Sequence, residues 1–66
     1  MDQKVIDDLK LSQANIESLK SLLDRLYYHS EFGTVRTRPV ISMLITACDY
    51  LTSNLGILAE QYRLKG

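Results

Sequence analysis

Few side chains in this 66-residue sequence could do chemistry, and none has the spacing that catalysis or metal binding requires. One cysteine, Cys48, and one histidine, His29, cannot supply the four ligands of a structural zinc site. Asp49 and Glu60 are separated by about 16 Å if they share a helix, which is too far for joint acid–base catalysis. The sequence therefore predicts no enzyme, no metal or cofactor and no small-molecule substrate.

Cys48 and His29 each have a structural interpretation. Cys48 falls on an apolar stripe, with no basic residue near it in sequence to favour the thiolate, so we expect a buried, unreactive side chain. His29 comes where the first predicted helix ends, and a cation there suits the helix dipole. We expect a solvated capping histidine, with a pH-sensing or partner contact as the alternative.

Aromatic and arginine side chains gather in the segment that joins the two predicted helices. They are Tyr27, Tyr28, Phe32, Arg36 and Arg38. Both residue types are enriched in the hot spots of protein interfaces, which favours a binding tip at this end of the molecule. In the alternative interpretation, Phe32 and Val35 fold over the open end of the core.

Two helices, over about 2–29 and 39–64, must position these residues, and the loop over about 30–38 joins them. Each helix has an apolar stripe with alternating steps of three and four residues. The first stripe consists of Val5, Leu9, Ser12, Ile16, Leu19, Leu23 and Leu26. The second consists of Ile41, Leu44, Cys48, Leu51, Leu55, Leu58 and Tyr62.

The loop contains the expected signals for a helix end and a helix start. Gly33 suits the left-handed conformation that closes many helices, and Pro39 suits the first turn of the next one. Thr37 is the better capping side chain, with Arg38 as the alternative. The sequence leaves open a break of the first helix near Ser12, which could cap a new helix.

We therefore predict one all-α domain over residues 1–66, an antiparallel two-helix hairpin in which the two stripes pack together. The predicted layers are Leu26–Ile41, Leu23–Leu44, Leu19–Cys48, Ile16–Leu51, Ser12–Leu55, Leu9–Leu58 and Val5–Tyr62. Residues 1–33 carry a net charge of −2 and residues 34–66 a net charge of +2. Opposite charges on successive segments suit antiparallel neighbours.

A second apolar row on the second helix is then left facing outward. It contains Met43, Tyr50, Ile57 and Leu64. An exposed strip of this kind marks an interface, and burying each large side chain contributes about 1.5–3 kcal/mol. A chain this short rarely has a stable core without a disulfide, a metal or another chain. We therefore expect self-assembly, for example into a four-helix bundle, or a protein partner.

The predicted location is the cytoplasm. The N-terminus shows no apolar signal segment, and a single unpaired cysteine suits a reducing compartment. The stretch 40–59 is apolar, but Asp49 at its centre argues against a membrane helix. Binding to membranes and to nucleic acid is not expected, because positive charge is not clustered: 8 basic residues balance 8 acidic ones.

The length, the hairpin pattern and an apolar second helix with Ala47 and Ala59 resemble the small E-type co-chaperones of type III secretion needles. The resemblance covers nearly the whole chain but involves no diagnostic motif. It implies a cytoplasmic hairpin that helps a partner chaperone keep the needle subunit soluble, with Met43, Tyr50, Ile57 and Leu64 facing the partner.

The sequence thus favours a non-enzymatic protein–protein interaction module, which self-assembles or docks its second helix on a partner. The alternative is a small nucleic-acid-binding regulator of Rop-like architecture. That alternative would depend on Arg36 and Arg38, and it predicts binding that weakens steeply with salt.

Overall fold

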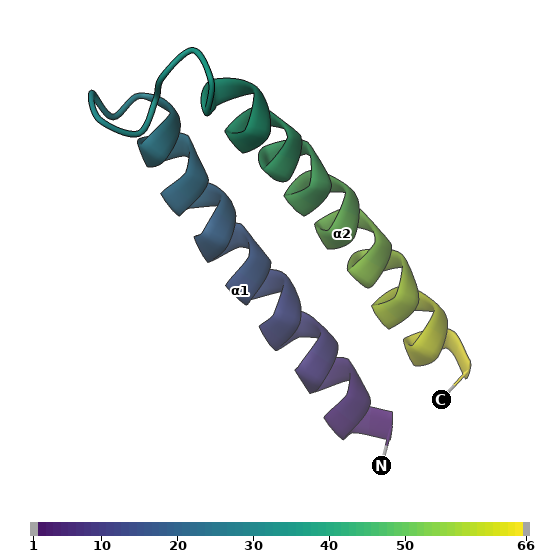
Figure 1. Ribbon diagram of the computed structural model, residues 1–66. Helices are drawn as coiled ribbons and strands as arrows, with labels where there is room; N and C mark the ends of the chain where they lie inside the picture. The colour runs from purple at the N-terminus through teal and green to yellow at the C-terminus, as the bar shows by residue number, and fades with distance from the viewer. Residues whose placement is uncertain (1, 66) are drawn as a thin grey trace.

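The computed structural model describes residues 2–65 as two long antiparallel helices joined by one loop (Figure 1). Helix α1 comprises Asp2–Tyr27 and helix α2 comprises Arg38–Lys65. The molecule is a narrow rod with extents of 47 × 14 × 11 Å, and both chain ends lie at the end opposite the loop. The predicted all-α hairpin is confirmed, and the helix bounds agree with the prediction to within about two residues.

Helix α1 is continuous, so the alternative of a break at Ser12 is wrong. Between Asp2 and Tyr27 the sequence contains neither glycine nor proline, and nothing local interrupts the backbone hydrogen bonds. Ser12 is an exposed residue within the helix rather than a cap. One rigid element therefore positions every side chain along this side of the hairpin.

Helix α2 begins where the sequence placed its cap. The Thr37 carbonyl accepts a hydrogen bond from the Ile41 amide (2.9 Å), which places Thr37 directly before α2. Its hydroxyl, however, bonds to Thr34 and Phe32 in the loop. The Thr34 amide donates to the Thr37 hydroxyl (3.0 Å), and the Thr37 amide donates to the Thr34 hydroxyl (3.2 Å). This reciprocal pair resembles a capping box in which Thr34 holds the cap position, and it fixes how the loop enters α2.

Gly33 is required by space and not by a left-handed backbone, so the predicted conformation is wrong. No glycine within residues 2–65 has a positive φ. A Cβ at Gly33 would instead overlap the carbonyl oxygen of Tyr27 and lie 2.9 Å from that of His29. The Gly33 amide donates to the His29 carbonyl (2.7 Å), and this bond holds the loop against the end of α1.

The core lies between the helices and is small. Leu23, Ile41 and Cys48 are buried in one cluster, and Ile6 is buried nearer the chain ends. Four partly buried residues pack against the cluster, namely Ile16, Leu26, Tyr27 and Ile45. Cys48 is a free thiol, and its predicted burial is confirmed.

The predicted packing layers are confirmed in part: their register along the axis agrees with the structure, but each helix is rotated from the predicted orientation. Leu19, Leu44, Leu51 and Leu58, all predicted seam residues, are about half exposed, whereas Leu23, Ile41 and Cys48 are buried as predicted. The buried and half-buried residues of α1 are Val5, Ile6, Leu9, Gln13, Ile16, Lys20, Leu23, Leu26 and Tyr27. Those of α2 are Ile41, Ile45, Cys48, Thr52, Asn54, Leu55, Gly56 and Ala59. On a helical wheel the mean direction of these residues differs by about 40° from that of the predicted stripe in each helix.

Polar side chains cross between the helices at two points that the apolar pattern did not predict. The Gln13 side-chain amide donates to the Thr52 carbonyl (3.0 Å), beside Gly56, whose missing side chain leaves room for it. The Lys20 ammonium pairs with Asp49 at 2.6 Å. Both contacts lie on the same side of the hairpin, where the Gln13 and Lys20 side chains of α1 are long enough to reach α2.

Candidate protein interaction surfaces

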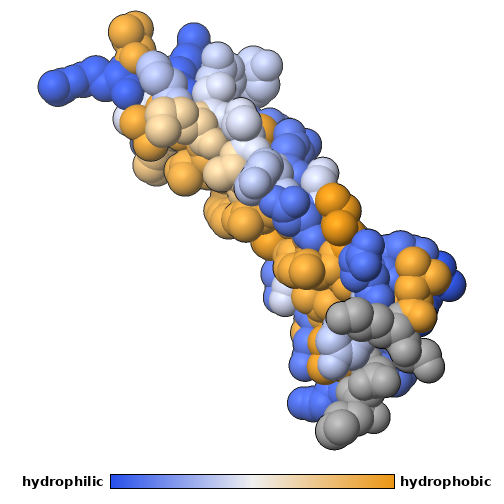
Figure 2. Space-filling model, turned by 90° about the vertical axis from the view of Figure 1, so that its right-hand side faces the viewer, coloured by the Kyte–Doolittle hydropathy of each residue, from blue (hydrophilic) through white to orange (hydrophobic). Residues whose placement is uncertain are grey.

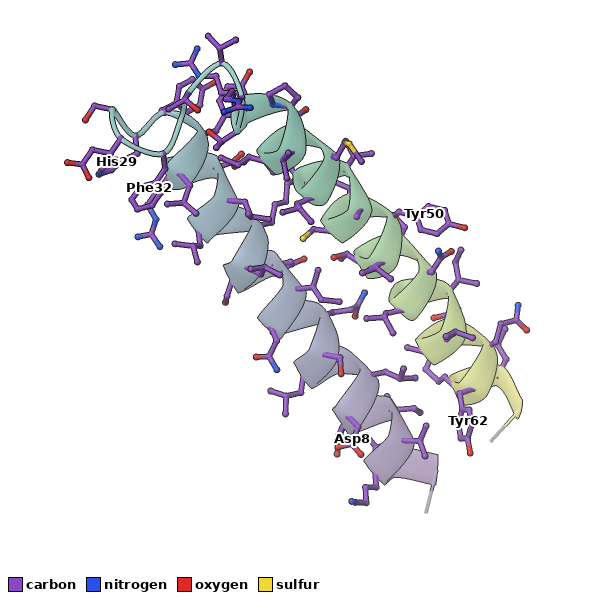
Figure 3. All side chains as sticks on the ribbon, in the orientation of Figure 1. Asp8, His29, Phe32, Tyr50 and Tyr62 are labelled. Atoms are coloured by element: carbon purple, nitrogen blue, oxygen red, sulfur yellow. The ribbon has the colours of Figure 1, made fainter. Side chains whose placement is uncertain are left out.

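The outer strip of α2, consisting of Met43, Tyr50, Ile57 and Leu64, faces away from α1. Its four side chains are between 58% and 72% exposed, so the prediction that this row is left uncovered by α1 is confirmed. Tyr50 projects outward from α2 in Figure 3. A shallow groove beside the strip is lined by Ser42, Met43, Thr46, Ala47 and Tyr50. The strip is an apolar surface with a polar tyrosine hydroxyl at its middle.

A second apolar surface, the leucine face, consists of Leu19 and Leu22 of α1 with Leu44, Leu51 and Leu58 of α2. Their side chains are between 43% and 54% exposed. On a helical wheel the leucine rows of both helices turn toward the same side of the hairpin. The leucine face therefore spans both helices and adjoins the outer strip. The sequence pattern had assigned four of these leucines, Leu19, Leu44, Leu51 and Leu58, to the hairpin seam.

Figure 2 shows the side of the hairpin that carries α2, where apolar residues follow the length of the molecule between polar ones. Across residues 3–64, fifteen large hydrophobic side chains are exposed, against four buried hydrophobic residues. Single exposed hydrophobic residues are ordinary on soluble proteins, but contiguous rows of them mark interaction sites. The exposed residues of α2 recur at regular spacing in two such rows, one in the outer strip and one in the leucine face.

The loop-end cluster consists of Tyr27, Tyr28, Phe32, Arg36 and Arg38. Tyr27 and Tyr28 pack edge to face at 5.0 Å between ring centroids, and the Arg38 guanidinium lies 5.5 Å from the Tyr27 ring centre. Tyr27 is partly buried against the core, whereas Tyr28, Phe32, Arg36 and Arg38 are exposed. The structure thus brings these predicted binding residues to one end of the molecule.

The alternative in which Phe32 and Val35 cover the open end of the core is wrong. Val35 is 91% exposed, and about half of the Phe32 side chain is exposed. The Phe32 ring lies 5.1 Å from the His29 ring, on the outside of the loop (Figure 3). Tyr27 occupies the position beside the core that Phe32 was expected to take.

His29 stabilises the loop locally. It is exposed, and its Nδ1 accepts a hydrogen bond from the Glu31 amide (3.1 Å). His29 is thus solvated, as predicted, and its side chain bonds within the turn that follows α1.

Ion pairs on the surface have simple geometry and shift the pKa values of their members. The hydrogen bond to Asp49 and its negative charge raise the pKa of Lys20 above its ordinary value of 10.5. The Arg63 guanidinium lies 2.5 Å from the Glu60 carboxylate, and it lowers the pKa of Glu60 below 4.5. All four side chains are at least partly exposed to solvent.

Within residues 2–65 no three histidine, cysteine, aspartate or glutamate side chains come together in a group that could hold a metal ion. Length and hydropathy alone would allow the segment Arg38–Leu64 to cross a membrane. A single helix of this kind is weak evidence for a membrane segment, because helices of soluble proteins meet the same criteria. The high hydropathy of α2 comes from its exposed apolar residues as well as from those that pack against α1.

No family model, curated protein or solved structure matches the chain. The resemblance to the E-type co-chaperones therefore stays a prediction from length and pattern.

Proposed function

We propose that this chain is a non-enzymatic protein–protein interaction module of the cytoplasm, which self-assembles or docks α2 on a partner. The observation that carries the proposal is the excess of exposed apolar surface on a small, narrow fold. The chain has a solvent-accessible surface of 5262 Å². A compact monomer of 7.5 kDa would expose about 4,200 Å².

The outer strip is the surface that we assign to a heterologous partner. It lies on the side of α2 opposite α1, so a partner helix or groove could contact it without disturbing the hairpin. Helices that dock in this way use anchors spaced by about one or two turns on one face. Met43, Tyr50, Ile57 and Leu64 repeat at every seventh residue, which places them on one face of α2.

Within this class we propose the role of a co-chaperone that keeps an assembly-prone subunit soluble. The support is the resemblance in length and hairpin pattern to the E-type co-chaperones. An exposed apolar helix face suits this task, because it can cover the apolar surface of another chain until that chain is used.

Nucleic-acid binding is the less favoured alternative, because four of the cations have partners within the chain. A nucleic-acid footprint needs unpaired cations clustered on one face. Lys4, Lys20 and Arg63 each lie beside a carboxylate, and Arg38 lies over the Tyr27 ring. The proposal therefore concerns proteins.

A photoreactive phenylalanine analogue at position 50, in cells that produce the full chain, tests the outer strip. We expect a discrete protein adduct at position 50, and we expect the additional substitution Ile57→Glu to abolish it. The analogue at Leu11, an exposed leucine of α1, is the matched control and should give no such adduct. Unchanged adduct formation by a helical Ile57→Glu chain would rule out the outer strip as the docking surface.

A further inference from the structure

The leucine face is the broad apolar surface that the hairpin leaves open between its two helices. The opposite side of the hairpin carries charged groups: Lys10, Glu60 and Arg63 line a groove there together with Ile6 and Ala59, and Lys20 pairs with Asp49. The leucine rows of α1 and α2 both lie on the other side. The hairpin is thus two-sided, with charged groups along one edge of the helix contact and leucines along the other.

The rotation of the helices indicates what shape of partner fits this face. The predicted stripe of each helix points about 40° away from the neighbouring helix, and both stripes turn toward the leucine face. In a four-helix bundle of square cross-section, the centre lies about 45° from the line that joins neighbouring helices. The two helices are therefore oriented as two adjacent corners of such a bundle, and the missing corners lie over the leucine face.

The combined solvent-accessible surface of two separate chains exceeds that of a compact protein of the same total mass by an amount that stable homodimers bury. A compact 15 kDa protein exposes about 7,000 Å², so two copies of this chain would bury about 3,500 Å² in reaching that compactness. Stable homodimers bury about 2,000–5,000 Å² in total. A two-helix partner along the full 47 Å length could cover an area of this size, whereas a short peptide could not.

The charge of the leucine face favours a second copy as that partner. Between the leucines lie neutral residues such as Ala47 and Asn54, and the whole chain has a formal net charge of zero. A two-fold interface brings a surface against itself, so any charge near the axis would meet its own copy. Leucine would here meet leucine, and no net repulsion opposes association.

We propose that two copies of the chain pack through their leucine faces into an antiparallel four-helix bundle. This inference rests on the proposed function as an interaction module and names the occupant of a surface separate from the outer strip. In the dimer Leu19, Leu44, Leu51 and Leu58 occupy the bundle core, as their periodicity predicts. Met43, Tyr50 and Ile57 remain outside, where a heterologous partner can still reach them.

Sedimentation equilibrium of the purified full chain, from micromolar to millimolar concentration, tests the dimer. We expect twice the chain mass, and we expect Leu51→Glu to weaken the dissociation constant at least a hundredfold, since each dimer loses two buried leucines. Val35→Glu introduces the same charge at a loop residue that is 91% exposed and lies away from the leucine face, and it should leave the dimer intact. A monomeric wild-type chain, or equal effects of the two variants, would overturn the proposal.

Photo-leucine in place of leucine tests the same surface without a charged substitution. In a mixture of isotopically light and heavy chains, we expect cross-links between copies at Leu44, Leu51 and Leu58, and none at Leu64 of the outer strip. Cross-links between copies through the outer strip would contradict this interface but leave the proposed function standing. A monomer whose outer strip still binds a partner would separate the two proposals in the same way.

Discussion

Gly33 lies where the loop passes closest to the end of α1. Because a Cβ there would meet the backbone of Tyr27 and His29, the loop must shift to accept alanine. We expect Gly33→Ala to destabilise the hairpin by about 1–3 kcal/mol, in the upper part of the range for point substitutions. The measurement is urea unfolding followed by helicity at fixed protein concentration.

Gly56 provides the matched control, because a side chain there would meet another side chain and not the backbone. A Cβ there would lie 3.1 Å from the end of the flexible Gln13 side chain, which can move by the small distance needed. Alanine also favours the helix over glycine by about 1 kcal/mol. We expect Gly56→Ala to stabilise the chain by up to about 1 kcal/mol, and equal losses for both alanine variants would refute the steric explanation for Gly33.

At the scale of single residues, the sequence predicted the role of some side chains correctly and missed the contacts of others. Thr37 directly before α2 and Cys48 as a buried thiol followed from local chemistry, which the fold did not override. Gly33 was recognised as essential to the loop, but the reason was not visible, because a close backbone approach depends on tertiary geometry. Gln13 and Lys20 were missed at the helix contact, because both are ordinary surface residues in a helical pattern.

At the scale of the helices, the existence, length and register of both could be predicted, whereas their rotation could not. The period fixes how far apart the apolar residues lie along each helix. The period does not fix which part of a broad apolar face packs against the other helix. Ile6, Ile45 and Ala59 lie beside the leucine rows, so a second apolar surface was available for that contact. The helices pair through that surface and leave Leu44 and Leu51 half exposed.

The Lys20–Asp49 pair joins the two helices, and its pH dependence can be predicted. The folded chain raises the pKa of Lys20 above 10.5, so the pair stabilises the fold fully below pH 10.5 and loses its effect as pH rises through the raised value. We expect Asp49→Asn to lower stability slightly at pH 7, with a difference from wild type that shrinks above pH 10.5 and in high salt.

Glu17→Gln is the control for that experiment, because it removes one negative charge from an exposed position of α1. Its difference from wild type should not change across the same alkaline range. Urea unfolding at several pH values measures both variants. A pH-independent effect of Asp49→Asn would show that the ion pair does not carry the interaction between the helices.

At the scale of the whole molecule, the hairpin leaves much of its apolar surface exposed, and we propose that another chain covers it. The core within residues 3–64 contains four buried hydrophobic residues, and below about 70–80 residues a single core rarely supplies more than about 3–5 kcal/mol. The sequence predicted this deficit from length and from the second row on α2. It did not predict the leucine face, because that surface appears only once the rotation of both helices is known.

Dependence of the fold on another chain is the central claim, and thermal unfolding over a hundredfold range of chain concentration tests it most directly. If copies assemble, helicity and Tm rise with concentration, since association stabilises only the folded state. If the required partner is a different protein, the isolated chain is poorly helical and aggregates at every concentration. A fully helical monomer that unfolds cooperatively, with a Tm independent of concentration, would contradict the claim.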